Sequence, residues 1–216
     1  KISSRLDTEF IPIIASFKID NKTVKNILKV AQDYRDFNIH CATLNFYLAK
    51  ELRSKFNPQN TILITGDMMN EFIVDYKEEI VDGKVYYNLP KIPLARLRNF
   101  LIRGLETSDR ELGVFHNFNF YTIQPYNCLI DEYMSINPNY LNDDNFKYRI
   151  NKKFIPKKIL DIISKKKNRA QSCDKGFGAL NLYINSKFDQ KYLKNLFNKT
   201  FLSKNSYEII EFGKYR

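Results

Sequence analysis

The stretch Thr61-Ile-Leu-Ile-Thr-Gly-Asp-Met-Met-Asn-Glu-Phe-Ile-Val-Asp-Tyr76 decides the fold. Its first five residues are apolar or β-branched and end at Gly66, a pattern typical of a buried strand in a parallel sheet. Ligands of such sheets bind at the carboxyl ends of the strands, so we expect Asp67, Asn70 and Glu71 to face a crevice. The alternative interpretation is an acidic helix start, because the helix dipole favours Asp67 and Glu71 there.

Helical spacing of apolar residues dominates the rest of the chain. We expect Thr8 to cap a helix that starts near Phe10 and holds Pro12 in its first turn. The pair Asp82-Gly83 lies between apolar residues and predicts a small hairpin or a surface loop. Further helices are predicted at residues 23–37, at 43–56, along Leu94 to Leu105, around Leu129 to Met134 and at Pro156 to Ile163. The pattern changes from α/β to mostly helical near residue 80.

The bulk composition indicates one globular domain, because 216 residues with 44% hydrophobic content can bury a real core. No run approaches the roughly 20 apolar residues of a membrane span, and the sequence as given does not open with a charged segment followed by an apolar one, so we expect no signal peptide. Three widely separated cysteines suggest neither a disulfide framework nor a zinc site. We therefore expect a cytoplasmic protein without membrane partners. Two histidines leave little material for a His-rich metal centre or a Ser-His-Asp hydrolase.

The net charge of +11 suggests an anionic partner such as RNA, or a nucleotide-binding protein from a lysine-rich proteome. Much of the excess lies in lysine clusters at 152–153, 157–158 and 165–167. We interpret these clusters as a solvated helix face rather than a nucleic-acid footprint, because aromatic residues are not interleaved with them as in a base-stacking platform.

The stretch after the predicted strand resembles a motif of the asparagine synthetases and β-lactam synthetases. That motif reads Gly-Asp/Glu-Gly-Ala/Ser-Asp-Glu-Leu-Phe-Gly-Gly-Tyr, and residues 66–76 keep Gly66, Asp67, Glu71 and Tyr76 at the same spacing. Two methionines replace small residues of the motif. Asn70 replaces an aspartate that the resemblance implies is a magnesium ligand.

The segment Ser3-Ser-Arg-Leu-Asp-Thr8 resembles the pyrophosphate loop of the same family, which reads Ser-Gly-Gly-Leu-Asp-Ser. Such a loop cradles phosphates with free backbone amides at a helix start. The resemblance implies that Ser3, Ser4, Arg5, Leu6, Asp7, Thr8 and Gly66 bind ATP and that Asp7 binds Mg²⁺. Ser4 and Arg5 replace the two glycines of the loop.

A third motif, Asp174-Lys-Gly-Phe-Gly178, resembles the family's Lys-x-Gly-Phe-Gly. The resemblance implies that Lys175, which lies one residue late, neutralises charge on an acyl-adenylate or a tetrahedral intermediate.

The segment Asn119-Phe-Tyr-Thr-Ile-Gln-Pro-Tyr126 takes the place of a Glu-x-Arg-x-Pro-Phe-Leu-Asp segment and lacks its glutamate and arginine. Because the order of the motifs is preserved, the resemblance spans nearly the whole chain.

The implied fold is α/β, with a parallel sheet of the adenine-nucleotide α-hydrolase (pyrophosphate-loop) type and a mostly helical C-terminal lobe. We expect residues 1–80 to form the nucleotide-binding part and residues 81–216 the helical lobe. The interval from Asp7 to Asp67 is roughly fifty residues shorter than in the family, more than one βαβ unit of about thirty residues. We therefore expect a shortened nucleotide site, or residues missing near Asp20, and further chain before Lys1.

The implied activity is an ATP-dependent, AMP-forming amide-bond ligase or amidotransferase synthetase that acts through an acyl-adenylate. Asp67 and Tyr76 would activate an amine, Lys175 would be catalytic, and Asp7 and Asn70 would hold magnesium. The implied partners are a small-molecule or peptide carboxylate and a separate glutaminase or amine-donor subunit. Two alternatives stay open: a pyrophosphate-loop tRNA-modifying enzyme, and a non-catalytic binding or scaffold protein derived from the ligase.

Overall fold

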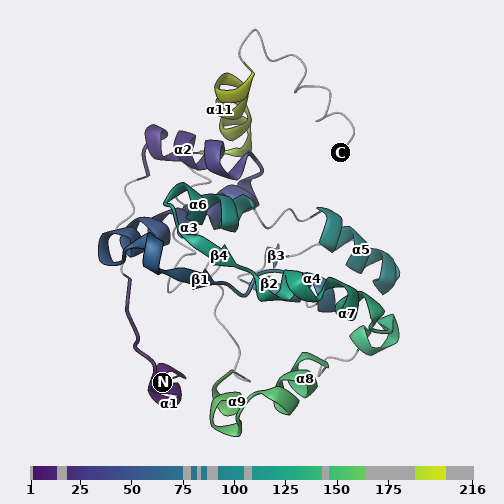
Figure 1. Cartoon of the computed structure of the whole chain (residues 1–216). Coiled ribbons are helices and arrows are strands. Elements are labelled where there is room, and N and C mark those ends of the chain that lie inside the picture. The colour runs from purple at the N-terminus through teal and green to yellow at the C-terminus, as the bar shows by residue number, and fades with distance from the viewer. Residues whose placement is uncertain are drawn as a thin grey trace. The chain divides into compact units, whose positions relative to one another are not determined.

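A computed structural model gives the fold (Figure 1) and describes residues 2–13, 19–74, 79–81, 84–86, 92–104, 109–142, 146–163 and 188–202. This part of the chain is mostly helical, with a small parallel sheet of strands β1 (Ile62–Ile64) and β4 (Tyr121–Ile123). Two compact units share the chain. Unit 1 comprises Lys1–Pro12, Ile64–Glu106 and Ile123–Lys167, and unit 2 comprises Ile13–Leu63, Thr107–Thr122 and Asn168–Arg216. Both units combine segments from before and after residue 80.

Unit 2 is built around the apolar faces of its helices α2 (Asn21–Ala31), α3 (Asp36–Lys55), α6 (Val114–Asn117) and α11 (Gln190–Phe201). Helix α2 is capped by Asp20, whose carboxylate accepts the Thr23 amide at 2.7 Å, and this hydrogen bond lowers the pKa of Asp20. The core brings together one apolar stripe from each helix and includes Val24, Ile27, Leu28, Ile39, Ala42, Val114, Phe115, Phe120 and Leu193.

The prediction of one helix over residues 23–37 is wrong in its second half, because α2 ends at Ala31 and α3 begins only at Asp36. Gln32 adopts a left-handed conformation, with φ 49°, and its amide caps Leu28. The Asp33 carboxylate then accepts the amides of Tyr34 at 2.7 Å and Arg35 at 2.9 Å. Aspartate competes in this way with helical hydrogen bonds, so the helix ends where periodicity alone predicts continuation.

A polar network fixes a π-helical turn (Asp109–Gly113) against α3. The Asp33 carboxylate also pairs with Arg35 at 2.7 Å and accepts the side-chain amide of Asn38. The Asn38 side-chain oxygen in turn accepts a hydrogen bond from the Arg110 guanidinium at 3.1 Å. The side-chain amide of Asn45 donates to the Arg110 carbonyl at 3.0 Å. The buried Arg110 is therefore held by side chains of α3 and of the turn before it.

Unit 1 contains helices α1 (Ile2–Leu6), α4 (Met69–Ile73), α5 (Leu94–Gly104), α7 (Ile130–Ser135), α8 (Phe146–Phe154) and α9 (Lys157–Ile163). Strands β2 (Glu79–Val81) and β3 (Lys84–Tyr86) pair antiparallel, which confirms the hairpin at Asp82-Gly83. The core of unit 1 contains apolar side chains of α4 and α5 and includes Met69, Ile73, Val74, Leu97, Leu101 and Leu141. No described helix is long and apolar enough to cross a membrane.

Two expectations about the amino-terminal half are corrected. The strand before Gly66 is present, but it is not buried, because Ile62 is 60% and Ile64 is 72% exposed. Only Leu63 between them contributes to the core of unit 2. No helix begins near Phe10 within the described residues up to Ile13, and the helix in this region, α1, precedes Thr8 instead.

Replacing Gly113 by alanine is expected to destabilise unit 2. The added Cβ would lie 3.0 Å from the Val30 carbonyl oxygen, so α2 and the π-helical turn would have to separate. We expect a loss of about 1–3 kcal/mol of unfolding free energy, measured by urea denaturation. The matched control is Gly66→Ala, because a Cβ there has no neighbouring atom within 4 Å. Equal stability of the two variants would contradict this close approach.

Candidate functional site

The candidate site lies at the carboxyl end of β1. The Thr65 amide donates to the Ile123 carbonyl at 3.0 Å, so the pairing of β1 with β4 reaches the last residue of β4. Because the strands are parallel, the segments that follow β1 and β4 leave the sheet at the same edge. The turn at Gly66 and Asp67 therefore lies beside the segment that begins with Gln124, although nearly sixty residues of sequence separate them.

The three polar side chains that follow Gly66 have different environments. Asp67 is half-buried and Asn70 is exposed, so both are open to solvent. Glu71 is only 1% exposed. The expectation that all three face a crevice is therefore wrong for Glu71, because α4 turns this side chain into the protein. Tyr76 lies outside the described residues.

Met68 and Met69, which replace small residues of the ligase motif, are both buried. Met69 belongs to the core of unit 1 together with Leu97 and Leu101 of α5. Met68 caps α4 in a left-handed conformation, with φ 76°. A left-handed backbone is unfavourable for a side chain of this size, so its packing must offset the strain. The two methionines therefore anchor the turn to the core.

Gly66 leaves open space beside the backbone of the turn. A Cβ at this position would meet no atom within 4 Å, so the protein does not itself require a glycine here. A glycine without an internal packing reason suits a point where a ligand approaches the main chain closely. Gly66 and the half-buried Asp67 are thus the residues of the site that are best placed to meet a ligand.

The segment Ser3–Thr8 does not form the predicted phosphate loop. Residues Ile2–Leu6 are helical, and Asp7 ends the helix in a left-handed conformation, with φ 54°. The Thr8 amide and hydroxyl both donate to the Ser3 carbonyl, at 3.0 Å and 3.4 Å. Arg5 donates to the Lys158 carbonyl of α9. In this conformation the Thr8 amide and the Arg5 guanidinium are engaged within the chain.

The expected metal and catalytic partners are brought together only in part. Within the described residues, no group of three or more acidic, histidine or cysteine side chains could hold a metal ion. Helix α1, which leads into Asp7, packs against α9, whereas α4, which carries Asn70, packs against α5 and α7. Lys175 lies outside the described residues. Asp67 and Gly66 therefore remain the part of the predicted site whose geometry the structure gives.

A buried arginine supports the site, and sequence reasoning gave it no role. Arg98 of α5 is 4% exposed and donates to the carbonyls of Tyr133 at 3.1 Å, Met134 at 3.2 Å and Ile136 at 3.0 Å. These carbonyls end α7, where a cation is favoured by the helix dipole. Burial lowers the pKa of Arg98, although a guanidinium stays charged at neutral pH.

The arginine positions α7, which in turn supports α4. The Tyr133 ring stacks on Phe72 with centroids 5.0 Å apart and planes 4° from parallel. Burial raises the pKa of Tyr133, and the neighbouring Tyr126 raises it further. The signal for this arrangement was present in the sequence, because Arg98 lies between Leu97 and Leu101 on the apolar stripe of its helix. A charge on such a stripe needs buried partners.

Comparison with known protein families and with curated proteins finds no match for this sequence.

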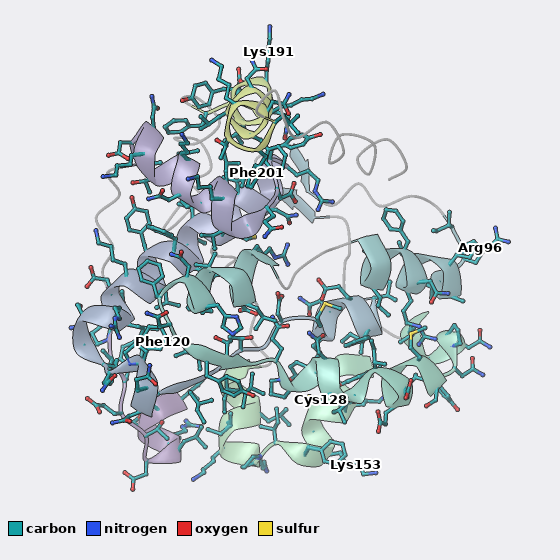
Figure 2. All side chains as sticks on the ribbon, turned by 45° about the horizontal axis from the view of Figure 1, so that its top comes forward. Arg96, Phe120, Cys128, Lys153, Lys191 and Phe201 are labelled. Carbon is teal, nitrogen blue, oxygen red and sulfur yellow. The ribbon has the colours of Figure 1, made fainter. Side chains whose placement is uncertain are left out.

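We predict that Arg98→Met lowers the stability of unit 1 by about 2–4 kcal/mol. The substitution leaves three carbonyls at the end of α7 without their donor. The matched control is Arg96→Met, because Arg96 is exposed on the same helix (Figure 2). Thermal unfolding followed by circular dichroism measures the difference. If the two variants unfold alike, the guanidinium does not hold α7.

Proposed function

We propose that the chain is an asparagine-synthetase-like ligase domain that forms an amide bond at the expense of ATP. The observation that carries this proposal is the parallel pairing of β1 with β4, extended by the bond from Thr65 to Ile123. It joins the Gly66 turn, which resembles a motif of the family, to residues 119–126, which take the place of the family's Glu-x-Arg-x-Pro-Phe-Leu-Asp segment. In an α/β sheet this shared edge is the usual place for a ligand.

In the proposed reaction a substrate carboxylate attacks the α-phosphate of ATP, forming an acyl-adenylate and releasing pyrophosphate. An amine then attacks the acyl carbon, and AMP leaves as the amide forms. Asp67 and Tyr76 act as the pair that removes a proton from the amine, and Lys175 stabilises the developing negative charge. The amine or ammonia comes from the substrate or from a separate subunit. A cytoplasmic location, where ATP is available, belongs to the same proposal.

Nucleotide binding by Ser3–Thr8 requires α1 to unwind. Helix α1 has five residues and buries none of its side chains, so little apolar contact opposes this change. Unwinding would release the Thr8 amide from Ser3 and Arg5 from Lys158. Magnesium is often bound by one or two protein oxygens together with substrate phosphates, and Asp7 and Asn70 would supply these.

A second candidate function is a non-catalytic binding protein derived from the ligase. The helical conformation of Ile2–Leu6 favours it, because this segment does not form the phosphate loop that the resemblance implies.

The proposal is tested by ATP–pyrophosphate exchange with a panel of small and peptide carboxylates. The complete protein is expected to exchange label with at least one of them in the presence of Mg²⁺. Asp67→Asn should lower the rate of amide formation by about 10²- to 10⁴-fold, the range for loss of a positioned acid or base, and should leave the exchange rate unchanged, because exchange reports only the adenylation step. Asp7→Ala should abolish exchange.

The control variant is Asp131→Asn, which removes the same charge from the exposed surface of α7. It is expected to exchange at the rate of the unaltered protein. Calorimetry with millimolar ATP and Mg²⁺ separates the two candidates. A protein that binds no nucleotide is not a ligase of this type, whereas binding without exchange favours the non-catalytic derivative.

A further inference from the structure

Helices α8 and α9 of unit 1 present a strongly basic surface. Lys152 and Lys153 end α8, Lys157 and Lys158 begin α9, and all four side chains are exposed. The exposed Arg5 of α1 joins them, because its guanidinium donates to the Lys158 carbonyl. We call these five residues the α8–α9 basic surface. Helices α8 and α9 pack against each other, so the lysines of both belong to one hairpin (Figure 1).

The charge of this surface is not neutralised within the described chain. Residues 146–163 contain six lysines and arginines and one acidic residue, Asp161. No described carboxylate forms a salt bridge with any of the four lysines. The two lysines of α9 lie in its first turn, which contains no acid. Cations there add to the positive end of the helix dipole, so they do not serve the stability of the helix.

Exposed aromatic rings accompany the lysines, so the interpretation of these clusters as a solvated helix face without interleaved aromatic residues is corrected here. Phe154, the last residue of α8, is 75% exposed, and the Lys153 ammonium lies 5.7 Å from the centre of its ring. The turn Pro138–Asn142 packs against α8 and exposes 59% of Tyr140. Exposed rings beside unpaired cations are the combination with which proteins stack the bases and contact the phosphates of a single strand.

We propose that the α8–α9 basic surface binds single-stranded nucleic acid. The lysines contact phosphates, and Phe154 stacks on a base. A bilayer fits less well, because an interfacial helix inserts a broad apolar face. Among the side chains at 149–150 and 152–160, whose exposure the structure describes, Phe154 is the one large apolar side chain that is exposed. This inference goes beyond the proposed ligase activity and does not depend on it.

The test uses the full chain and fluorescein-labelled U20 and T20 oligonucleotides, with fluorescence anisotropy between 50 and 200 mM KCl. The unaltered protein is expected to bind both, more weakly as salt rises. Lys152→Gln/Lys153→Gln should weaken binding roughly tenfold at 100 mM KCl. The slope of log K against log salt should fall by roughly 1.4, about 0.7 for each lost phosphate contact of a single strand.

The matched control is Lys191→Gln/Lys194→Gln, which removes the same charge from exposed positions of α11 in unit 2 (Figure 2). It should change the affinity by less than about twofold. Phe154→Leu should weaken binding roughly tenfold and leave the salt slope unchanged, because stacking releases no counterions. Circular dichroism confirms that each variant is folded.

Three results would overturn the proposal. The first is no binding of either oligonucleotide at 50 mM KCl. The second is an equal loss of affinity in the two double variants, which would assign the binding to net charge alone. The third is retention on vesicles of phosphatidylcholine with 30% phosphatidylserine without any oligonucleotide binding, which would assign the surface to a membrane. None of these results bears on ATP–pyrophosphate exchange.

Discussion

The parallel pairing of β1 with β4 is the constraint on which the candidate site depends. Each strand has three residues, and two strands alone are marginally stable in water. The pair persists because Leu63 of β1 packs on the core of unit 2 and Phe120, just before β4, is fully buried. The sheet is therefore held by the packing around it, and it fixes the register between the Gly66 turn and Gln124.

The exposure of this small sheet sets it apart from ordinary α/β folds. Parallel strands are normally covered on both faces, yet β1 exposes both of its isoleucines. A short run of apolar and β-branched residues predicts the strand correctly, because local propensity and the following glycine are sufficient. It cannot predict burial, since burial depends on which other strands and helices exist to cover the sheet.

The same distinction separates the predictable helices from the others. Amphipathic spacing found α5 and α9, and the Asp82-Gly83 turn found the β2–β3 hairpin, because both signals are local. The break at Gln32 was missed because the Asp33 side chain overrides the apolar period. Helix α1 was also missed, because periodicity gives no signal there. Its sequence lacks an apolar stripe, so the family resemblance, which implies a loop, decided the prediction.

The position of a candidate-site residue was predictable where it follows from the neighbouring sequence. It was not predictable where it depends on contacts with residues far along the chain. Gly66 and Asp67 follow from their place after a strand. The burial of Glu71 and the hydrogen bonds of Arg98 depend on α5 and α7, which lie far along the chain. No local pattern contains that information, although a charge on an apolar stripe is a warning that such contacts exist.

The residues that depart from the ligase motifs have structural roles of their own. Met68 and Met69 tie the Gly66 turn to the core, and Arg5 ties α1 to α9. On the proposed function, a glycine or serine at these positions would leave space for phosphates but would remove those contacts. Stability and ligand access would then compete at the same residues. Helix α1 buries none of its side chains whereas both methionines are buried, so opening Ser3–Thr8 to a ligand would cost fewer packing contacts than opening the Gly66 turn.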